Sequence, residues 1–206
     1  MKYGIMLKFM WAAFHGSFER ALKSELQVED ARFVMAAAHR DYKKILSEVD
    51  EFDKKSRFKV CILSASLFLA VLMNLPFHPT VEQMKNYFRK AMCDNFFMKL
   101  AAIKSDSYTP KGRAKLKADA AFSQTVTNPY DWRFTVQDGE SINQYTAVFT
   151  SCGICYLMKK WGYFEYTPAL CALDYDMAAM NHSVFTRKST LASGGSCCDC
   201  HYDHKA

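Results

Sequence analysis

The chain has 206 residues, of which 50% are apolar and 15% aromatic, so it can bury the core of one large domain. Its net charge of +6 arises in residues 1–120, which carry 21 Lys and Arg against 13 Asp and Glu. Because acidic residues are mixed among the basic ones and no nucleic-acid-binding motif is present, the charge pattern argues against a nucleic-acid partner.

The sequence carries eight cysteines, which bear on the redox compartment. A chain of this length does not depend on disulfides to hold its core together. Lys2 is followed by an apolar run, but Lys8 interrupts that run and no small-residue cleavage site follows, so we find no convincing secretory signal. We therefore expect a reduced cytoplasmic protein whose cysteines are thiols or metal ligands.

The first part of the chain is predicted to be helical. Residues 3–14 are apolar and aromatic and predict a short helix, which is expected to end at Gly16-Ser17, with Ser17 as the N-cap of the next helix. From there to Asp53, apolar residues recur at spacings of three and four, as they do in one or two amphipathic helices.

Residues 59–75 form the most apolar segment and are predicted to be a buried helix. The apolar run at 61–77 is close to the shortest length that spans a membrane. However, Ser64, Ser66 and Asn74 dilute it. We therefore expect a core helix without stable membrane insertion, and a membrane-associated protein is the alternative.

A further helix is predicted to begin after Thr80, which can act as its N-cap with Gln83 at the third helical position. An apolar stripe of Met and Phe extends this helix to Ile103. Residues 105–112 are a polar break, and residues 111–122 predict a short basic helix.

The composition changes after residue 123, where β-branched and aromatic residues become frequent. Asp138-Gly139 is a turn signal between two such runs. The predicted order is two strands, two helices and two strands, at 132–136, 144–150, 153–161, 166–181, 183–191 and 198–202.

This order predicts an α+β fold, in which a helical N-terminal half packs on a C-terminal antiparallel sheet of about four strands with two crossing helices. We expect a single domain over residues 1–206. It would consist of a helical layer at 1–123 and a cysteine-rich α+β layer at 124–206.

Six of the eight cysteines lie within one stretch of the second half, at Cys152, Cys155, Cys171, Cys197, Cys198 and Cys200. Cys152 and Cys155 form a C-x-x-C pair, a spacing that suits either two ligands of one metal or a redox pair. No βαβ pattern surrounds the pair, which argues against a thioredoxin-like function. Cys61 and Cys93 lie in apolar helices and are predicted to be inert packing residues.

Cys171 and Asp174 stand three residues apart on a predicted helix and are expected to share one face. On the last strand, Cys198 and Cys200 would project from one face, and Cys197 and Asp199 from the other. The alternative for all these cysteines is that they are small buried hydrophobic residues. Their concentration beside a carboxylate favours a site instead.

At these residues the chain resembles the L-2-amino-thiazoline-4-carboxylic acid hydrolase family. The resemblance extends over residues 145–203, and Cys155, Cys197 and Cys200 depart from the family pattern. The family is in turn similar to vinyl-4-reductase domains, which hold a cysteine-rich zinc site beside a hydrophobic pocket. The matching pieces are Cys152, Gly162, Glu165, Pro168, Cys171, Asp174, Phe185-Thr186-Arg187, Thr190-Leu191-Ala192, Gly194-Gly195 and Cys198-Asp199.

The resemblance implies a hydrolase that opens a small cyclic amidine-like substrate, such as 2-amino-thiazoline-4-carboxylate, to a carbamoyl-cysteine. We expect the catalytic group to comprise Cys152, Cys171, Asp174 and Cys198. Arg187 would bind a substrate carboxylate, and Asp199 would support the substrate site.

Two mechanisms are open. In the first, Zn²⁺ held by Cys152, Cys171 and Cys198, with Cys155 as a further ligand, activates water. In the second, a cysteine of lowered pKa is the nucleophile and Asp174 orients its partner. The alternative function is a non-enzymatic small-molecule sensor or carrier whose cysteine-rich metal site is structural. A homo-oligomer is compatible with the sequence.

Overall fold

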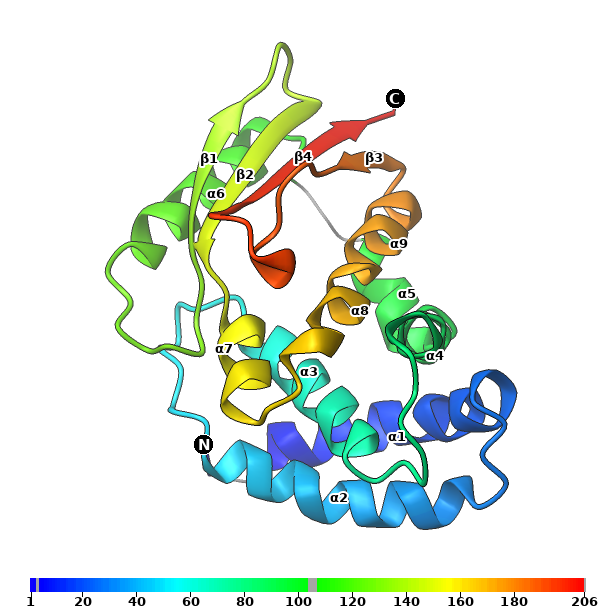
Figure 1. The fold of residues 1–206 in the computed structure, drawn as a ribbon. Coiled ribbons are helices and arrows are strands. Elements are labelled where there is room, and N and C mark those ends of the chain that lie inside the picture. Colours follow the sequence, from blue (N-terminus) through cyan, green and yellow to red (C-terminus); the bar gives the residue numbers. More distant parts are fainter. Residues whose placement is uncertain (3, 104–106, 206) are drawn as a thin grey trace.

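The computed structural model describes residues 1–2, 4–103 and 107–205. The N-terminal part is helical and the C-terminal part carries a four-stranded antiparallel sheet, so the predicted α+β fold is confirmed (Figure 1). The helices before the sheet are α1 (Ile5–Glu25), α2 (Ala31–Ser47), α3 (Lys59–Leu72), α4 (Val81–Cys93), α5 (Phe96–Ile103) and α6 (Pro110–Ser123).

The sheet has the strand order β1-β2-β4-β3, and each neighbouring pair is antiparallel. Its strands are β1 (Arg133–Asp138), β2 (Gln144–Ser151), β3 (Ser183–Thr186) and β4 (Cys198–His204). Between β2 and β3 lie α7 (Gly153–Lys160), the 3₁₀ turn η1 (Phe164–Tyr166), α8 (Thr167–Cys171) and α9 (Leu173–Met180). The 3₁₀ turn η2 (Leu191–Ser193) separates β3 from β4.

The elements are arranged so that α3, α7, α8 and α9 lie between the sheet and the outermost helices, α1 and α2 (Figure 1). Helix α6 packs on β1, and α9 packs on β3. Arg113 of α6 is buried and fixes the β1–β2 hairpin, because its guanidinium donates to the carbonyls of Ile142 and Gln144 and to the carboxylate of Asp138.

The prediction of a helix break at Gly16-Ser17 is wrong. Helix α1 continues through both residues, and the Ser17 hydroxyl donates to the Phe14 carbonyl within the helix. Burial of Phe14 and Phe18 on one face outweighs the cost of the glycine within the helix. The chain instead turns after Leu26, where Gln27 has a φ of 54°.

The apolar segment at 59–75 forms the buried helix α3, which ends at Leu72. Among the residues that the structure describes, no helix is long and apolar enough to cross a membrane. The Thr80 capping box with Gln83 is present as predicted.

The helix predicted from 81 to 103 divides into α4 and α5. Asn95 lies at the break, where its Oδ1 accepts the Phe97 N–H at 2.9 Å and its Nδ2 donates to the Ala13 carbonyl at 2.8 Å. A tertiary contact to α1 therefore fixes this break. The predicted helix at 111–122 corresponds to α6, and the start of the predicted polar break, at 105–106, lies outside the described residues.

The strand predicted at 183–191 is too long, since β3 ends at Thr186. Asp199 of β4 causes the difference, because its Oδ1 accepts the backbone N–H groups of Lys188 and Ser189 at 3.0 and 2.7 Å. These bonds hold residues 188–189 in a loop and not in the ladder. The helix predicted at 166–181 is likewise divided, into η1, α8 and α9.

The core consists of two clusters. The larger fills the helical layer, and the smaller lies on the inner face of the sheet and includes Phe134, Tyr145 and Phe185. Phe58 and Phe149 pack against both clusters. Cys198 and Cys200 are buried on the inner face of β4, opposite Phe149 and Ala147 of β2. The region between the two clusters is therefore lined by side chains of both layers.

Gly153 fixes the start of α7. A Cβ at this position would lie 1.9 Å from the Tyr130 carbonyl oxygen, so only glycine allows the backbones to approach this closely. We expect Gly153→Ala to lower the free energy of unfolding by about 2–3 kcal/mol through overpacking.

The matched control is Gly16→Ala. A Cβ there meets only the flexible Arg20 side chain at 3.6 Å, and alanine is the better helix former. We expect a gain of about 0.5–1 kcal/mol. Urea unfolding of both variants measures the difference, and equal stability of the two would contradict the close approach at Gly153.

Candidate functional site

The best-defined interaction in the second half is an ion pair between Asp174, in the first turn of α9, and Arg187, which follows β3. The Arg187 Nη1 donates to Asp174 Oδ2 at 2.8 Å, and Nη2 donates to the Cys171 carbonyl at 3.3 Å. The Arg187 side chain is only 8% exposed and its guanidinium lies against the rings of Tyr175 and Phe185. One arginine thus joins the end of α8, the start of α9 and the end of β3.

Asp174 is the electrostatic centre of a group of thiols. Burial raises the pKa of its carboxyl above the ordinary value, and Arg187 opposes that increase. Burial and then the charge of Asp174 raise the pKa of three thiols, those of Cys61, Cys171 and Cys200. These come from α3, α8 and β4, so the carboxylate lies among three separate elements.

The three cysteines predicted to form the core of the site surround the same region. The pKa of Cys171 is raised by burial, by Asp174, and also by the nearby Cys152 and Cys198. Cys198 is fixed by the loop before β4, because its Sγ accepts the Leu191 N–H at 3.2 Å. We call the group of Cys61, Cys152, Cys171, Asp174, Arg187, Cys198 and Cys200 the interior site.

The side chains of the interior site are only partly enclosed by protein. Asp174 lies deep in the protein, and burial is the largest cause of its raised pKa, yet 45% of its side-chain surface is accessible to a water-sized probe. Cys61 and Cys171 likewise combine partial exposure with a pKa raised first by burial. These side chains are therefore surrounded by much protein but are not sealed from water.

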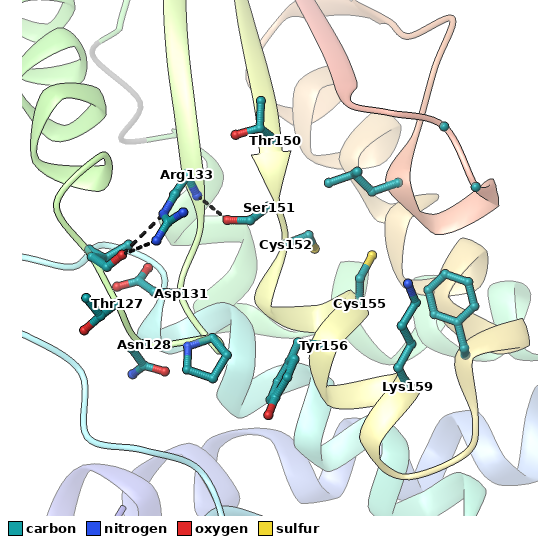
Figure 2. A pocket seen from close by; sticks show the side chains of 16 residues that line it. Thr127, Asn128, Asp131, Arg133, Thr150, Ser151, Cys152, Cys155, Tyr156 and Lys159 are labelled. Atoms are coloured by element: carbon teal, nitrogen blue, oxygen red, sulfur yellow. Dashed lines mark hydrogen bonds between the residues drawn. The ribbon is translucent and has the colours of Figure 1, made fainter.

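A pocket of about 580 Å³, which we call the outer pocket, lies beside the start of α7 (Figure 2). Figure 2 shows Cys152 and Cys155 at the N-terminal end of α7, with Lys159 one turn further along the helix. Cys152 belongs to both the outer pocket and the interior site, so it connects them. Other lining residues include Asn128, Asp131, Arg133, Ser151, Tyr156, Phe164, Leu191, Gly194 and Gly195.

The residues do not fit the predicted zinc site. Within the part of the chain that the structure describes, no three His, Cys, Asp or Glu side chains lie close enough together to hold a metal ion. Cys152 and Cys198 lie near enough to Cys171 to raise the pKa of its thiol, but the three cysteines do not form such a group. Zinc bound by these residues and Cys155 stays a prediction, and we derive no step through it.

Two further predicted residues have different surroundings. Asp199 projects from the outer face of β4, where it holds the loop at Lys188 and Ser189. Arg187 reaches the interior site, but Asp174 and the Cys171 carbonyl already occupy two of its five N–H groups. No spacing along the chain predicted that Arg187 would pair with Asp174.

Other members of the site were missed. Cys200 could have been included, because residues two apart on a strand share a face and Cys200 therefore lies beside Cys198. Cys61 carried no signal, since only the packing of α3 against α7 brings it near Cys152. Its pKa is raised to about 12, which agrees with the prediction of an unreactive thiol. The loop at 126–131 that forms one wall of the outer pocket was also missed.

One comparison with known proteins gives a match. The sequence profile of the family described as L-2-amino-thiazoline-4-carboxylic acid hydrolase matches residues 61–202, well over half of the chain. The matched region contains all residues of the interior site. No curated protein and no solved structure matches the chain.

The ion pair can be tested with Arg187→Met. Breaking a buried pair costs about 3–5 kcal/mol, and we expect roughly half of that because Asp174 keeps accessible surface. Without Arg187 the pKa of Asp174 rises further, so the folded state favours the protonated carboxyl. The loss of stability should therefore be largest at pH 8 and decrease as the pH falls toward 5.

The matched control is Arg89→Met. Arg89 of α4 pairs at 2.7 Å with Asp176, which lies on α9 as Asp174 does. The Arg89 side chain is 63% exposed, so its removal should change stability by less than about 1 kcal/mol. Thermal unfolding over this pH range measures both variants. An Arg187→Met effect as small and pH-independent as the control would show that Asp174 is not a buried carboxylate.

Proposed function

The chain belongs to the L-2-amino-thiazoline-4-carboxylic acid hydrolase family, and on this premise we propose that it opens a small cyclic amidine-like substrate by hydrolysis. The specific substrate that we propose is 2-amino-thiazoline-4-carboxylate, and the product is a carbamoyl-cysteine. The observation that carries the proposal is a single carboxylate of raised pKa, Asp174, with the neutral thiols of Cys171 and Cys200 near it.

The hydrolysis transfers both protons of one water molecule. Water adds to the ring carbon that lies between sulfur and nitrogen, a base takes one proton from that water, and the ring nitrogen takes up a proton. The carbon–sulfur bond then breaks, the added hydroxyl loses its proton and becomes the carbonyl, and the sulfur leaves and takes up a proton. A single group that accepts each proton from the oxygen and passes it on, first to the nitrogen and then to the sulfur, completes the hydrolysis.

We assign this role to Asp174. A carboxyl whose pKa is raised by burial is a stronger base than an ordinary aspartate, and it returns a proton more readily near neutral pH. Arg187 holds the carboxylate in place at 2.8 Å and limits the increase in its pKa. Arg187 also interacts with the Cys200 thiol, and we propose that its remaining N–H groups bind the substrate carboxylate.

Cys152, Cys171 and Cys198 line the place where we put the substrate. The pKa values of Cys152 and Cys171 are raised, the first by Cys155 and burial and the second by burial and Asp174. Both are therefore neutral thiols at pH 7, which disfavours the thiolate-nucleophile route and favours attack by water. Neutral thiols can still donate hydrogen bonds to the ring nitrogen and the leaving sulfur. Asp199 supports the site indirectly by holding the loop that follows Arg187.

The second candidate function is non-enzymatic binding of a small apolar molecule. It is favoured by the aromatic side chains of Phe58 and Phe149, which lie between the two core clusters. Such an interior suits a ligand that is held and not converted. The two functions differ in whether ring opening occurs.

Turnover of 2-amino-thiazoline-4-carboxylate by the purified chain, followed as release of a new thiol, tests the proposal. We expect Asp174→Asn to lower kcat by about 10²–10⁴-fold, the usual contribution of a general base. The wild-type kcat should fall at acidic pH with a midpoint above 3.8, the ordinary value for aspartate, and Asp174→Asn should lose this pH dependence.

The matched control is Asp176→Asn, which removes the other carboxylate of α9, the one that pairs with Arg89 of α4. This variant should keep kcat within about twofold of the wild type. Elemental analysis of the same preparations tests the zinc prediction. Binding of the substrate without ring opening would support the carrier function. Full turnover by Asp174→Asn would remove Asp174 from the mechanism.

A further inference from the structure

Cys152 and Cys155 occupy the first turn of α7 in an arrangement that the proposed hydrolysis does not use. Cys152 is the N-cap residue of α7 with an extended backbone, and Cys155 is the third helical residue. Both line the outer pocket, and Figure 2 shows both side chains at the same end of the helix. From this placement we propose that the two residues form a reversible intrachain disulfide.

The backbone already has the required geometry. Residues three apart at the start of a helix have Cα atoms about 5–6 Å apart, which lies within the range of about 4.4–6.8 Å found for disulfides. The turn between them is also fixed, because Gly153 packs directly against the Tyr130 carbonyl. Closure of the bond therefore needs side-chain rotation and no rearrangement of α7.

The two sulfurs already interact. Cys155 is the largest cause of the raised pKa of Cys152, ahead of burial. Cys155 is only 8% exposed and Cys152 is more exposed, so a reagent entering the outer pocket reaches Cys152 first and Cys155 is the resolving thiol. Cys198 and Cys200 lack this arrangement, since they are successive inner-face residues of one extended strand.

The bond forms by exchange with a low-molecular-weight disulfide such as oxidised glutathione. Cys152 first loses its proton, its thiolate attacks one glutathione sulfur, a mixed disulfide forms, and the first glutathione leaves as a thiol. Because the pKa of Cys152 is raised, this exchange is slow at pH 7 and faster at higher pH. The Cys155 sulfur then attacks Cys152, and the second glutathione leaves. The two cysteines lose two electrons and two protons, and one glutathione disulfide becomes two glutathione thiols.

The consequence for activity rests on the proposed function. Cys152 belongs to both the outer pocket and the interior site, so a bond to Cys155 turns its sulfur away from the substrate and toward α7. We expect the oxidised chain to lose most of its turnover and to regain it with a dithiol reductant. Disulfide formation itself does not depend on the hydrolase assignment.

The test equilibrates the full-length chain with oxidised glutathione, alkylates the remaining thiols with N-ethylmaleimide under denaturing conditions, and measures the intact mass. The reduced chain should carry eight adducts, one for each cysteine, and the oxidised chain two fewer. Peptide mapping should place the bond between Cys152 and Cys155.

Cys155→Ser should prevent closure and leave glutathione bound to Cys152, and the matched control Cys197→Ser should close as the wild type does. If Cys155→Ser does not fold, peptide mapping of the oxidised wild type alone shows whether the bond joins Cys152 to Cys155.

Eight alkylated thiols after oxidation, stable glutathione on wild-type Cys152, or a bond at another pair would each overturn the proposal. A closed Cys152–Cys155 bond in a chain without ring-opening activity would contradict only the hydrolase function. Activity without closure would contradict only the disulfide.

Discussion

The second half of the molecule depends on the ion pair between Asp174 and Arg187. Arg187 is nearly inaccessible to solvent and Asp174 lies deep between the layers, so neither charge is stable there without the other. The same guanidinium holds the Cys171 carbonyl. Because the pair joins α8, α9 and the end of β3, it also sets where Cys171 lies relative to the sheet. The two charges that stabilise the junction of α8, α9 and β3 are therefore also the charged groups of the proposed site.

The two core clusters explain why a site forms at this place. The helical layer and the inner face of the sheet each bury their own apolar residues, and only a few side chains, among them Phe58 and Phe149, pack against both. Thiols and one carboxylate line the region between the clusters. Low polarity there raises the pKa of Cys61, of Cys171 and of the carboxyl, which keeps these two thiols neutral and makes the carboxylate basic. Cys152 connects this region to the outer pocket.

The periodicity of the sequence predicted most of the elements, because hydrophobic spacing and the Thr80–Gln83 cap are local signals. The boundaries that failed are set by tertiary contacts. Asn95 divides a helix because it bonds to α1, and Asp199 ends β3 early because it bonds to the loop at 188–189. Cys171 and Asp174 were expected on one continuous helix, whereas they belong to α8 and α9, and Arg187 brings the two together. The partner of a buried charge could not be read from spacing along the chain.

The most direct test of this account is the pKa of Asp174, measured by ¹³C NMR of the aspartate carboxyl carbons, with its resonance identified by its absence in Asp174→Asn. The account predicts a value above the ordinary 3.8, because burial outweighs the effect of Arg187. A value at or below 3.8 would show that the carboxylate is solvated or fully neutralised by its partner. It would then not be a suitable base for the proposed reaction.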